Sequence, residues 1–306
     1  MRIAFLGTSS FACPSLRSLA QVHDILFVIT QPDRPVGRHL KLAPPPVKPE
    51  AARLGLSVIQ PEKANEPSTL GLLNNANPEL IVVAAYGQIL RKAVLSAASM
   101  GAVNIHASLL PKYRGAAPIN WAIIRGEELT GVTTMLMDER MDTGDILMKR
   151  SVEIGKDETA GELHDRLAAL GAEVIVDTLD EMIAGSLTPT PQQGPASYAP
   201  KLTRDDGRID WDRPAREIHN LVRGMSPWPS TFTLLGNERL KIHHTSLTGI
   251  ARGAWKAGEI SLPSTGRLLV ATSDELIEIT DIQRQSRPRS TGQDFLNGLR
   301  GQARFS

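Results

Sequence analysis

The stretch from Val103 to Pro118 most constrains the fold of this chain, because polar residues there interrupt an apolar strand pattern. In an extended segment, residues two apart share a face. Asn104 and His106 are therefore predicted to project together from the end of a strand, while Val103 and Ile105 point into the core. A buried Asn/His pair with a purely structural role is the alternative.

The same stretch also predicts how the strand ends. The residue before a proline is pushed away from helical geometry, so Leu110-Pro111 directs the chain into a loop. Pro118 suits the first turn of a helix that would follow. A strand, a polar loop and a helix in succession are the parts from which ligand sites in open α/β sheets are built.

Three other continuous apolar runs predict strands buried on both faces, at residues 2–7, 25–30 and 80–85. With the helical spacings between them, they predict an α/β fold: a Rossmann-like, mostly parallel sheet with helices on both faces. The turn after residue 7 lacks the G-x-G-x-x-G pattern, so no nicotinamide cofactor is expected and a dehydrogenase is a poor alternative.

A second domain is predicted after the stretch 188–195, which is rich in Pro and Gly and free of charge. We expect a catalytic domain at 1–188, a linker at 189–206 and a C-terminal domain at 207–306. Short strand patterns beyond residue 230, with a hairpin signal at Gly236-Asn237, predict a small OB-like β-barrel. Residues 207–306 carry 14 Lys and Arg against 10 Asp and Glu, whereas residues 1–188 carry 18 against 21. A basic C-terminal domain is therefore expected.

Composition excludes several classes of protein. No apolar stretch is long enough to span a bilayer, and no secretory signal opens the sequence, so we expect a cytoplasmic protein. Cys13 is the single cysteine, which rules out an internal disulfide framework. His243-His244 lacks partners at ligand spacing, and no metal is expected.

The segment 31–48 is far longer than the usual connection of about four to six residues. It carries Arg34, Arg38, Lys41 and Lys48 against a single Asp33, and its prolines stiffen it. A stiff cationic segment suits contact with a phosphate backbone. A solvated surface loop is the alternative.

A second polar break separates the apolar segments 132–137 and 146–152. Its four acidic residues lack the alternation and the terminal glutamate of an EF-hand calcium loop. Asp142-Thr143-Gly144 instead fits a turn that presents one functional carboxylate.

The run Ser108 to Ile119 (SLLPKYRGAAPI) resembles the folate-dependent formyltransferases, and in particular those that act on methionyl-tRNA. The resemblance implies catalysis by Asn104, His106 and Asp142, and a 10-formyltetrahydrofolate donor. It also implies initiator methionyl-tRNA as acceptor, bound by an inserted loop that enters the acceptor arm, and we expect a monomer. The implied binding residues are, for the folate, Ser108, Leu109, Leu110, Pro111 and Gln88, and for the tRNA, Arg38, Lys41 and Arg34. The family often opens with Gly-Thr-Pro and an acidic residue, where this chain has Gly7-Thr8-Ser9-Ser10.

Formyl transfer needs an oxyanion stabilised and a proton moved, which suits an amide, an imidazole and a carboxylate. Other formyltransferases share this set: the hydrolase domain of formyltetrahydrofolate dehydrogenase and the sugar-nucleotide amine formyltransferases. A glycinamide ribonucleotide formyltransferase would normally lack the second domain. From a different class, an RNA-binding module on an inactive α/β scaffold is an alternative, against which the intact catalytic set argues.

Overall fold

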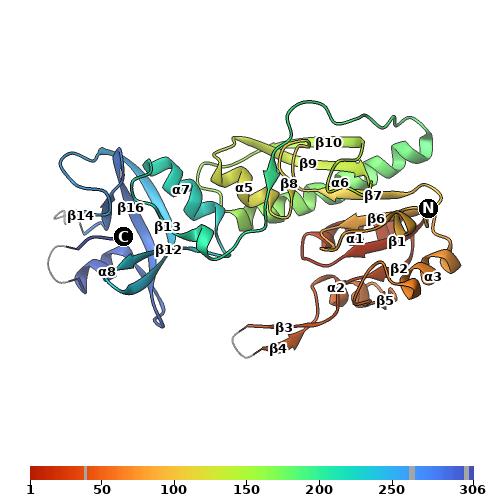
Figure 1. Cartoon of the computed structure of the whole chain (residues 1–306), viewed down its shortest axis with the longest axis horizontal. Coiled ribbons are helices and arrows are strands. Elements are labelled where there is room, and N and C mark those ends of the chain that lie inside the picture. Colours follow the sequence, from red (N-terminus) through yellow and green to blue (C-terminus); the bar gives the residue numbers. More distant parts are fainter. Residues whose placement is uncertain (38–39, 262–265, 300–302) are drawn as a thin grey trace. The chain divides into compact units, whose positions relative to one another are not determined.

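The computed structural model describes residues 1–37, 40–261, 266–299 and 303–306 (Figure 1). The chain forms two compact units. The first comprises residues 1–118, 129–152 and 164–199, and the second comprises residues 119–128, 153–163 and 200–306. No helix in the described part of the chain combines the length and the apolar character needed to cross a membrane.

The first unit is built on a seven-stranded sheet with the order β10-β9-β7-β6-β1-β2-β5. Strands β7, β6, β1, β2 and β5 pair in parallel, and β9 runs antiparallel to β7. The predicted mostly parallel sheet is therefore confirmed. The strands are β1 (Arg2–Gly7), β2 (Asp24–Ile29), β5 (Val58–Ile59), β6 (Leu80–Ala84), β7 (Ala102–His106), β9 (Leu129–Leu136) and β10 (Ile146–Glu153).

Helices pack on both faces of this sheet, because both faces of its strands are apolar. Gly171 of one helix, α6, lies against Ile105 of β7. On the opposite face, Leu73 and Val94 from α3 and α4 share a buried cluster with Ile81 of β6. The helices that begin or lie in this unit are α1 (Ala12–Val22), α2 (Val47–Arg53), α3 (Pro67–Ala76), α4 (Lys92–Leu95), α5 (Pro118–Ile124) and α6 (Ala160–Ala184).

The strand order reverses at β1, since β2 and β5 extend the sheet on one side and β6, β7 and β9 on the other. Parallel strands present their carboxyl ends at one edge, and ligands bind at such a reversal. Gly7, Ala84 and His106 close β1, β6 and β7, and they therefore meet at this edge.

The long segment 31–48 is not an irregular loop. Two short strands, β3 (Arg34–Val36) and β4 (Lys41–Ala43), pair antiparallel as a separate two-stranded hairpin. This β3–β4 hairpin projects from the unit beside α2 in Figure 1. Two further short strands, β8 (Arg114–Gly115) and β11 (Tyr198–Ala199), pair in parallel.

The second unit contains an antiparallel half-barrel, with the order β12-β13-β16-β15-β14 and with β17 paired to β16. Residues 303–306 bond to both end strands: Phe305 bridges Leu235, and Ile260 N donates to the Ala303 carbonyl. The predicted smaller β domain is therefore confirmed. Its elements are η1 (Asp205–Gly207), α7 (Ala215–Gly224), β12 (Thr231–Leu235), β13 (Glu238–Ala251), β14 (Ile260–Ser261), β15 (Leu269–Ala271), β16 (Glu275–Arg284), β17 (Arg289–Thr291) and α8 (Gly292–Asn297).

Candidate active site

The end of β7 places Asn104 and His106 on one face of the strand, as alternation requires. Asn104 lies in register between Val83 of β6 and Met135 of β9, and His106 lies opposite Thr133. Val103 and Ile105, on the other face, are 0% and 2% exposed. The strand thus delivers an amide and an imidazole to the carboxyl edge of the sheet.

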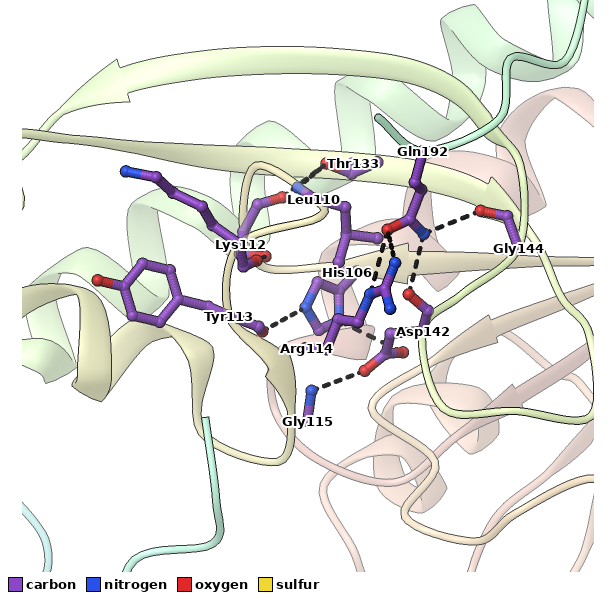
Figure 2. Close-up of polar contacts among 11 residues, drawn as sticks. His106, Leu110, Lys112, Tyr113, Arg114, Gly115, Thr133, Asp142, Gly144 and Gln192 are labelled. Atoms are coloured by element: carbon purple, nitrogen blue, oxygen red, sulfur yellow. Dashed lines mark hydrogen bonds and ion pairs between the residues drawn. The ribbon is translucent and has the colours of Figure 1, made fainter. Parts of the chain in front are cut away.

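The imidazole of His106 is held in place by a backbone carbonyl. Its Nε2 lies 3.0 Å from the Tyr113 oxygen, and because a carbonyl only accepts, Nε2 carries the hydrogen (Figure 2). Its Nδ1 faces Asp142, 3.7 Å from Oδ1. The His106 side chain is 6% exposed and that of Asp142 13%. Nδ1 is therefore the imidazole nitrogen that faces a carboxylate.

Asp142 reaches this position through a strained turn. Its φ is +53°, in the left-handed region. Its Oδ2 accepts a hydrogen bond of 2.8 Å from the Gly115 amide. Gly115 itself has φ +121°, and a Cβ there would lie 2.6 Å from the Ala199 carbonyl oxygen. Only glycine allows this close approach, so the carboxylate depends on Gly115 for its orientation.

The loop from Ser108 to Pro111 is fixed from the neighbouring strand. The Thr133 hydroxyl donates to the Ser108 carbonyl at 2.6 Å and accepts from the Leu110 amide at 3.1 Å. Lys149 donates to the Leu110 carbonyl, and burial lowers the pKa of its ammonium. The Ser108 hydroxyl donates to the Lys112 carbonyl at 2.6 Å, and Ser108 is fully buried. Its side chain shapes the loop.

Gln88 lies just after β6, and its side chain is bonded to the backbone of residues 62–64. Its Oε1 accepts from the Ala64 amide at 2.8 Å, and its Nε2 donates to the Glu62 carbonyl at 3.1 Å. The adjacent Ile89 is 67% exposed, an unusual position for a large apolar side chain beside a sheet edge.

Two of the predicted tRNA contacts, Arg34 and Lys41, lie on the β3–β4 hairpin. Arg34 pairs with Glu62 at 2.8 Å, with both side chains more than half exposed. Lys48 pairs with Asp33 at 2.9 Å. Two of the four basic residues of segment 31–48 thus have carboxylate partners. Lys41 is exposed, and it has no ion-pair partner within the described ranges. Arg38 lies outside the described residues.

Four contributors to the site were not expected from the sequence: the Tyr113 carbonyl, the Gly115 amide, Thr133 and Gln192. The first two are backbone groups, which carry no side-chain signal. Thr133 lies opposite His106 only through the antiparallel register of β7 and β9, which the sequence did not specify. Gln192 lies in the predicted linker, yet its amide bonds to the backbone of the Asp142 turn (Figure 2).

The described residues contain no group of three or more His, Cys, Asp or Glu side chains placed to hold a metal ion. The polar groups gathered at this edge are therefore an amide, an imidazole, a carboxylate and backbone donors. Together they can stabilise developing negative charge and move a proton.

Comparison with known proteins agrees with this chemistry. Residues 1–179 match the formyl transferase family model, and residues 201–300 match the model of the formyl transferase C-terminal domain. The methionyl-tRNA formyltransferase of Geobacter metallireducens is 47% identical over 302 residues, which cover 98% of this chain and 96% of the relative.

Two solved structures share the fold at low identity. WlaRD, a sugar 3N-formyl transferase crystallised with dTDP and 5-N-formyl-THF, is 18% identical with a TM-score of 0.68, over 94% of this chain and 99% of that one. HypX from Aquifex aeolicus is 19% identical with a TM-score of 0.66 over 98% of this chain, which spans about half (48%) of the HypX chain. The architecture is thus shared beyond close relatives. The sequence match over nearly the whole length places this chain in the methionyl-tRNA formyltransferase family.

Proposed function

We propose that the protein transfers the formyl group of 10-formyltetrahydrofolate to the α-amino group of methionine on initiator tRNA, giving N-formylmethionyl-tRNA. The observation that carries the proposal is the pairing of His106 with Asp142, 3.7 Å apart, beside Asn104 at the end of β7. Family membership supports the acceptor, and the sugar formyltransferase WlaRD, crystallised with 5-N-formyl-THF, supports a folate donor.

The reaction exchanges one C–N bond for another. The α-amino nitrogen attacks the formyl carbon, a tetrahedral oxyanion forms, and the bond to the folate nitrogen breaks. The proton lost by the amine ends on that folate nitrogen, so no covalent enzyme intermediate is needed. Asn104 supplies an uncharged N–H donor for the oxyanion, a type of contact worth about 3 kcal/mol in comparable sites.

His106 acts at Nδ1, because its Nε2 hydrogen is committed to Tyr113. Protonated there, it supplies positive charge near the oxyanion. The Asp142 carboxylate stabilises that cation by charge, since 3.7 Å exceeds hydrogen-bond length. Asp142 and His106 thereby share the transfer of the amine's proton to the leaving nitrogen.

We assign the folate to the edge lined by Ser108, Leu109, Leu110, Pro111 and Gln88. Ile89, next to Gln88, and Met141, next to Asp142, are 67% and 56% exposed. They provide apolar surface for a flat ring. Ser108 acts through the loop backbone, since its side chain is buried.

We assign the tRNA backbone to Arg34, Arg38 and Lys41. The Arg34–Glu62 pair is exposed on both sides, so exchange of Glu62 for a phosphate costs little. Leu40 and Leu42, 71% and 69% exposed, add apolar surface for contact with a base. Under this proposal residues 1–188 carry the catalytic side chains, and residues 189–206 connect the two domains while part of them packs against the site. Residues 207–306 add a basic tRNA-binding surface, and the protein is a cytoplasmic monomer.

The test is a formylation assay with purified protein, charged initiator tRNA and formyl-labelled 10-formyltetrahydrofolate. We expect label in N-formylmethionine after deacylation, and none with free methionine. A dTDP-linked amino sugar serves as the competing acceptor. Label on the sugar and none on the tRNA would contradict the proposal and assign the chain to sugar modification.

A further inference from the structure

We infer that Gln192 is a positioning residue for the reaction, holding the Asp142 turn against His106; this rests on the proposed function. Its Nε2 donates to the carbonyls of Asp142 and Gly144, each at 2.9 Å (Figure 2). One side-chain amide therefore bonds to the backbone on both sides of Thr143. Because it bonds to Asp142 itself, it fixes the backbone from which the catalytic carboxylate projects.

The turn needs such support because little regular structure holds it. It lies between the end of β9 at Leu136 and the start of β10 at Ile146. Asp142 is in the left-handed region, which is unfavourable for a residue with a side chain. Gly144 is packed against the Leu136 carbonyl. A conformation of this kind persists only where surrounding contacts enforce it, and Gln192 supplies two of them.

The amide oxygen of Gln192 bonds to the segment whose backbone orients His106. Its Oε1 accepts from Arg114, at 2.7 Å from Nη2 and 3.2 Å from Nε. Arg114 lies between Tyr113, whose carbonyl holds the imidazole, and Gly115, whose amide holds the carboxylate. Gln192 thus joins the two backbone segments that orient the imidazole and the carboxylate.

Gln192 is itself anchored on both sides along the chain. Thr190 exchanges two backbone hydrogen bonds with Ile146, at 2.8 and 2.9 Å. On the other side, the Ser197 carbonyl accepts from the Arg114 amide at 2.9 Å, and β11 pairs with β8. The stretch 190–199, which has the composition of a linker, is therefore part of the frame of the site.

The test compares Gln192→Ala and Gln192→Glu with a matched control, Gln193→Ala. The Glu variant keeps the size and an acceptor for Arg114, but its carboxylate cannot donate to the two carbonyls. Gln193 is exposed, and among the described residues it makes no hydrogen bond or ion pair with the turn. We expect kcat to fall about tenfold in both Gln192 variants and to stay within twofold of wild type in the control. Wild-type kcat in both Gln192 variants would overturn the inference.

Two readouts separate positioning from a general structural role. First, amide hydrogen exchange without substrates should accelerate at residues 138–145 in both Gln192 variants and not in Gln193→Ala. Second, in an Asp142→Ala background, Gln192→Ala should change the residual rate by less than twofold, because its effect passes through Asp142. An equal loss in that background, or unchanged exchange, would overturn the inference. If the variants show accelerated exchange but the wild-type protein formylates no tRNA, the proposed function is contradicted, whereas the support of the turn by Gln192 stands.

Discussion

The edge of the large sheet and the β3–β4 hairpin, both in the first unit, differ in how far their side chains are buried and fixed. At the edge, His106 is 6% exposed and bonded to the backbone of Tyr113. On the hairpin, Leu40 is 71% exposed and the Arg34–Glu62 pair lies in solvent. Groups that act on a transition state gain from being fixed before substrate arrives, whereas groups that bind a large partner can be ordered by it. Under the proposed function, the fixed groups at the edge perform the chemistry and the exposed groups of the hairpin perform recognition.

The difference has a physical origin in pairing. Strand β7 lies between β6 and β9 within seven strands, whereas among the described strands β3 and β4 pair with each other alone. An isolated two-stranded hairpin is marginally stable in water. We therefore expect the edge to keep its geometry without a ligand and the hairpin to exchange its contacts when a partner binds.

The largest expected effect is at the edge. His106→Ala should lower kcat about 10²- to 10³-fold, because the variant loses the charge that stabilises the oxyanion. The measurement is initial-rate formylation at saturating tRNA, with circular dichroism to show that the fold is retained. A fully active variant would remove His106 from the mechanism.

On the hairpin side, Arg38→Ala should lower kcat/KM for the tRNA about tenfold with an unchanged melting temperature. The resemblance to methionyl-tRNA formyltransferases implies that this cation contacts the acceptor arm, and in the sequence it falls between the residues of β3 and those of β4. Rates measured at several salt concentrations check it, since a lost phosphate contact flattens the salt dependence. Equal activity of variant and wild type at moderate salt would contradict it.

The free energy of unfolding should respond to substitutions in the sheet and hardly at all to substitutions on the hairpin. Ile105→Val removes one methylene from a core position that is 2% exposed and should cost about 1 kcal/mol of unfolding free energy. The matched change Leu42→Val, at a position 69% exposed, should stay within about 0.5 kcal/mol of zero. Urea unfolding measures both. Equal costs would show that the hairpin is as firmly packed as the sheet.

The smallest effect is expected for Lys41→Ala. Loss of one exposed charge should raise KM for the tRNA roughly threefold at low salt and leave kcat unchanged. Titration of the tRNA at two salt concentrations checks this, and a lower kcat with unchanged KM would place Lys41 in the chemical step instead.

The sequence predicted elements where burial leaves a pattern. The apolar runs at 2–7 and 80–85 became β1 and β6, and Gly236-Asn237 joins β12 to β13. Strand β13 is longer than the short strands expected and runs to Ala251, because register shifts let it follow β16 over its length. At the start of α7, Asp274 from a distant segment accepts the Ala215 amide at 2.9 Å, a contact that no local sequence pattern indicates.

The site was predictable only where side chains carry the chemistry. Asn104, His106 and Asp142 interrupt apolar patterns, which drew attention to them, and the resemblance to formyltransferases implied their catalytic roles. Nothing about β3 and β4 marked them as strands, because Arg34, Pro35, Lys41 and Leu42 are exposed and set no apolar period. Gln192 was hidden because its neighbours are Pro and Gly, which indicate a linker whether or not it is docked.

The most direct test of the division between edge and hairpin is a single-turnover formylation rate at saturating tRNA and folate for Asp142→Ala and Lys41→Ala. The account predicts a rate at least about a hundredfold below wild type for Asp142→Ala and an unchanged rate for Lys41→Ala. A wild-type rate in Asp142→Ala, or an equal loss in both variants, would contradict it.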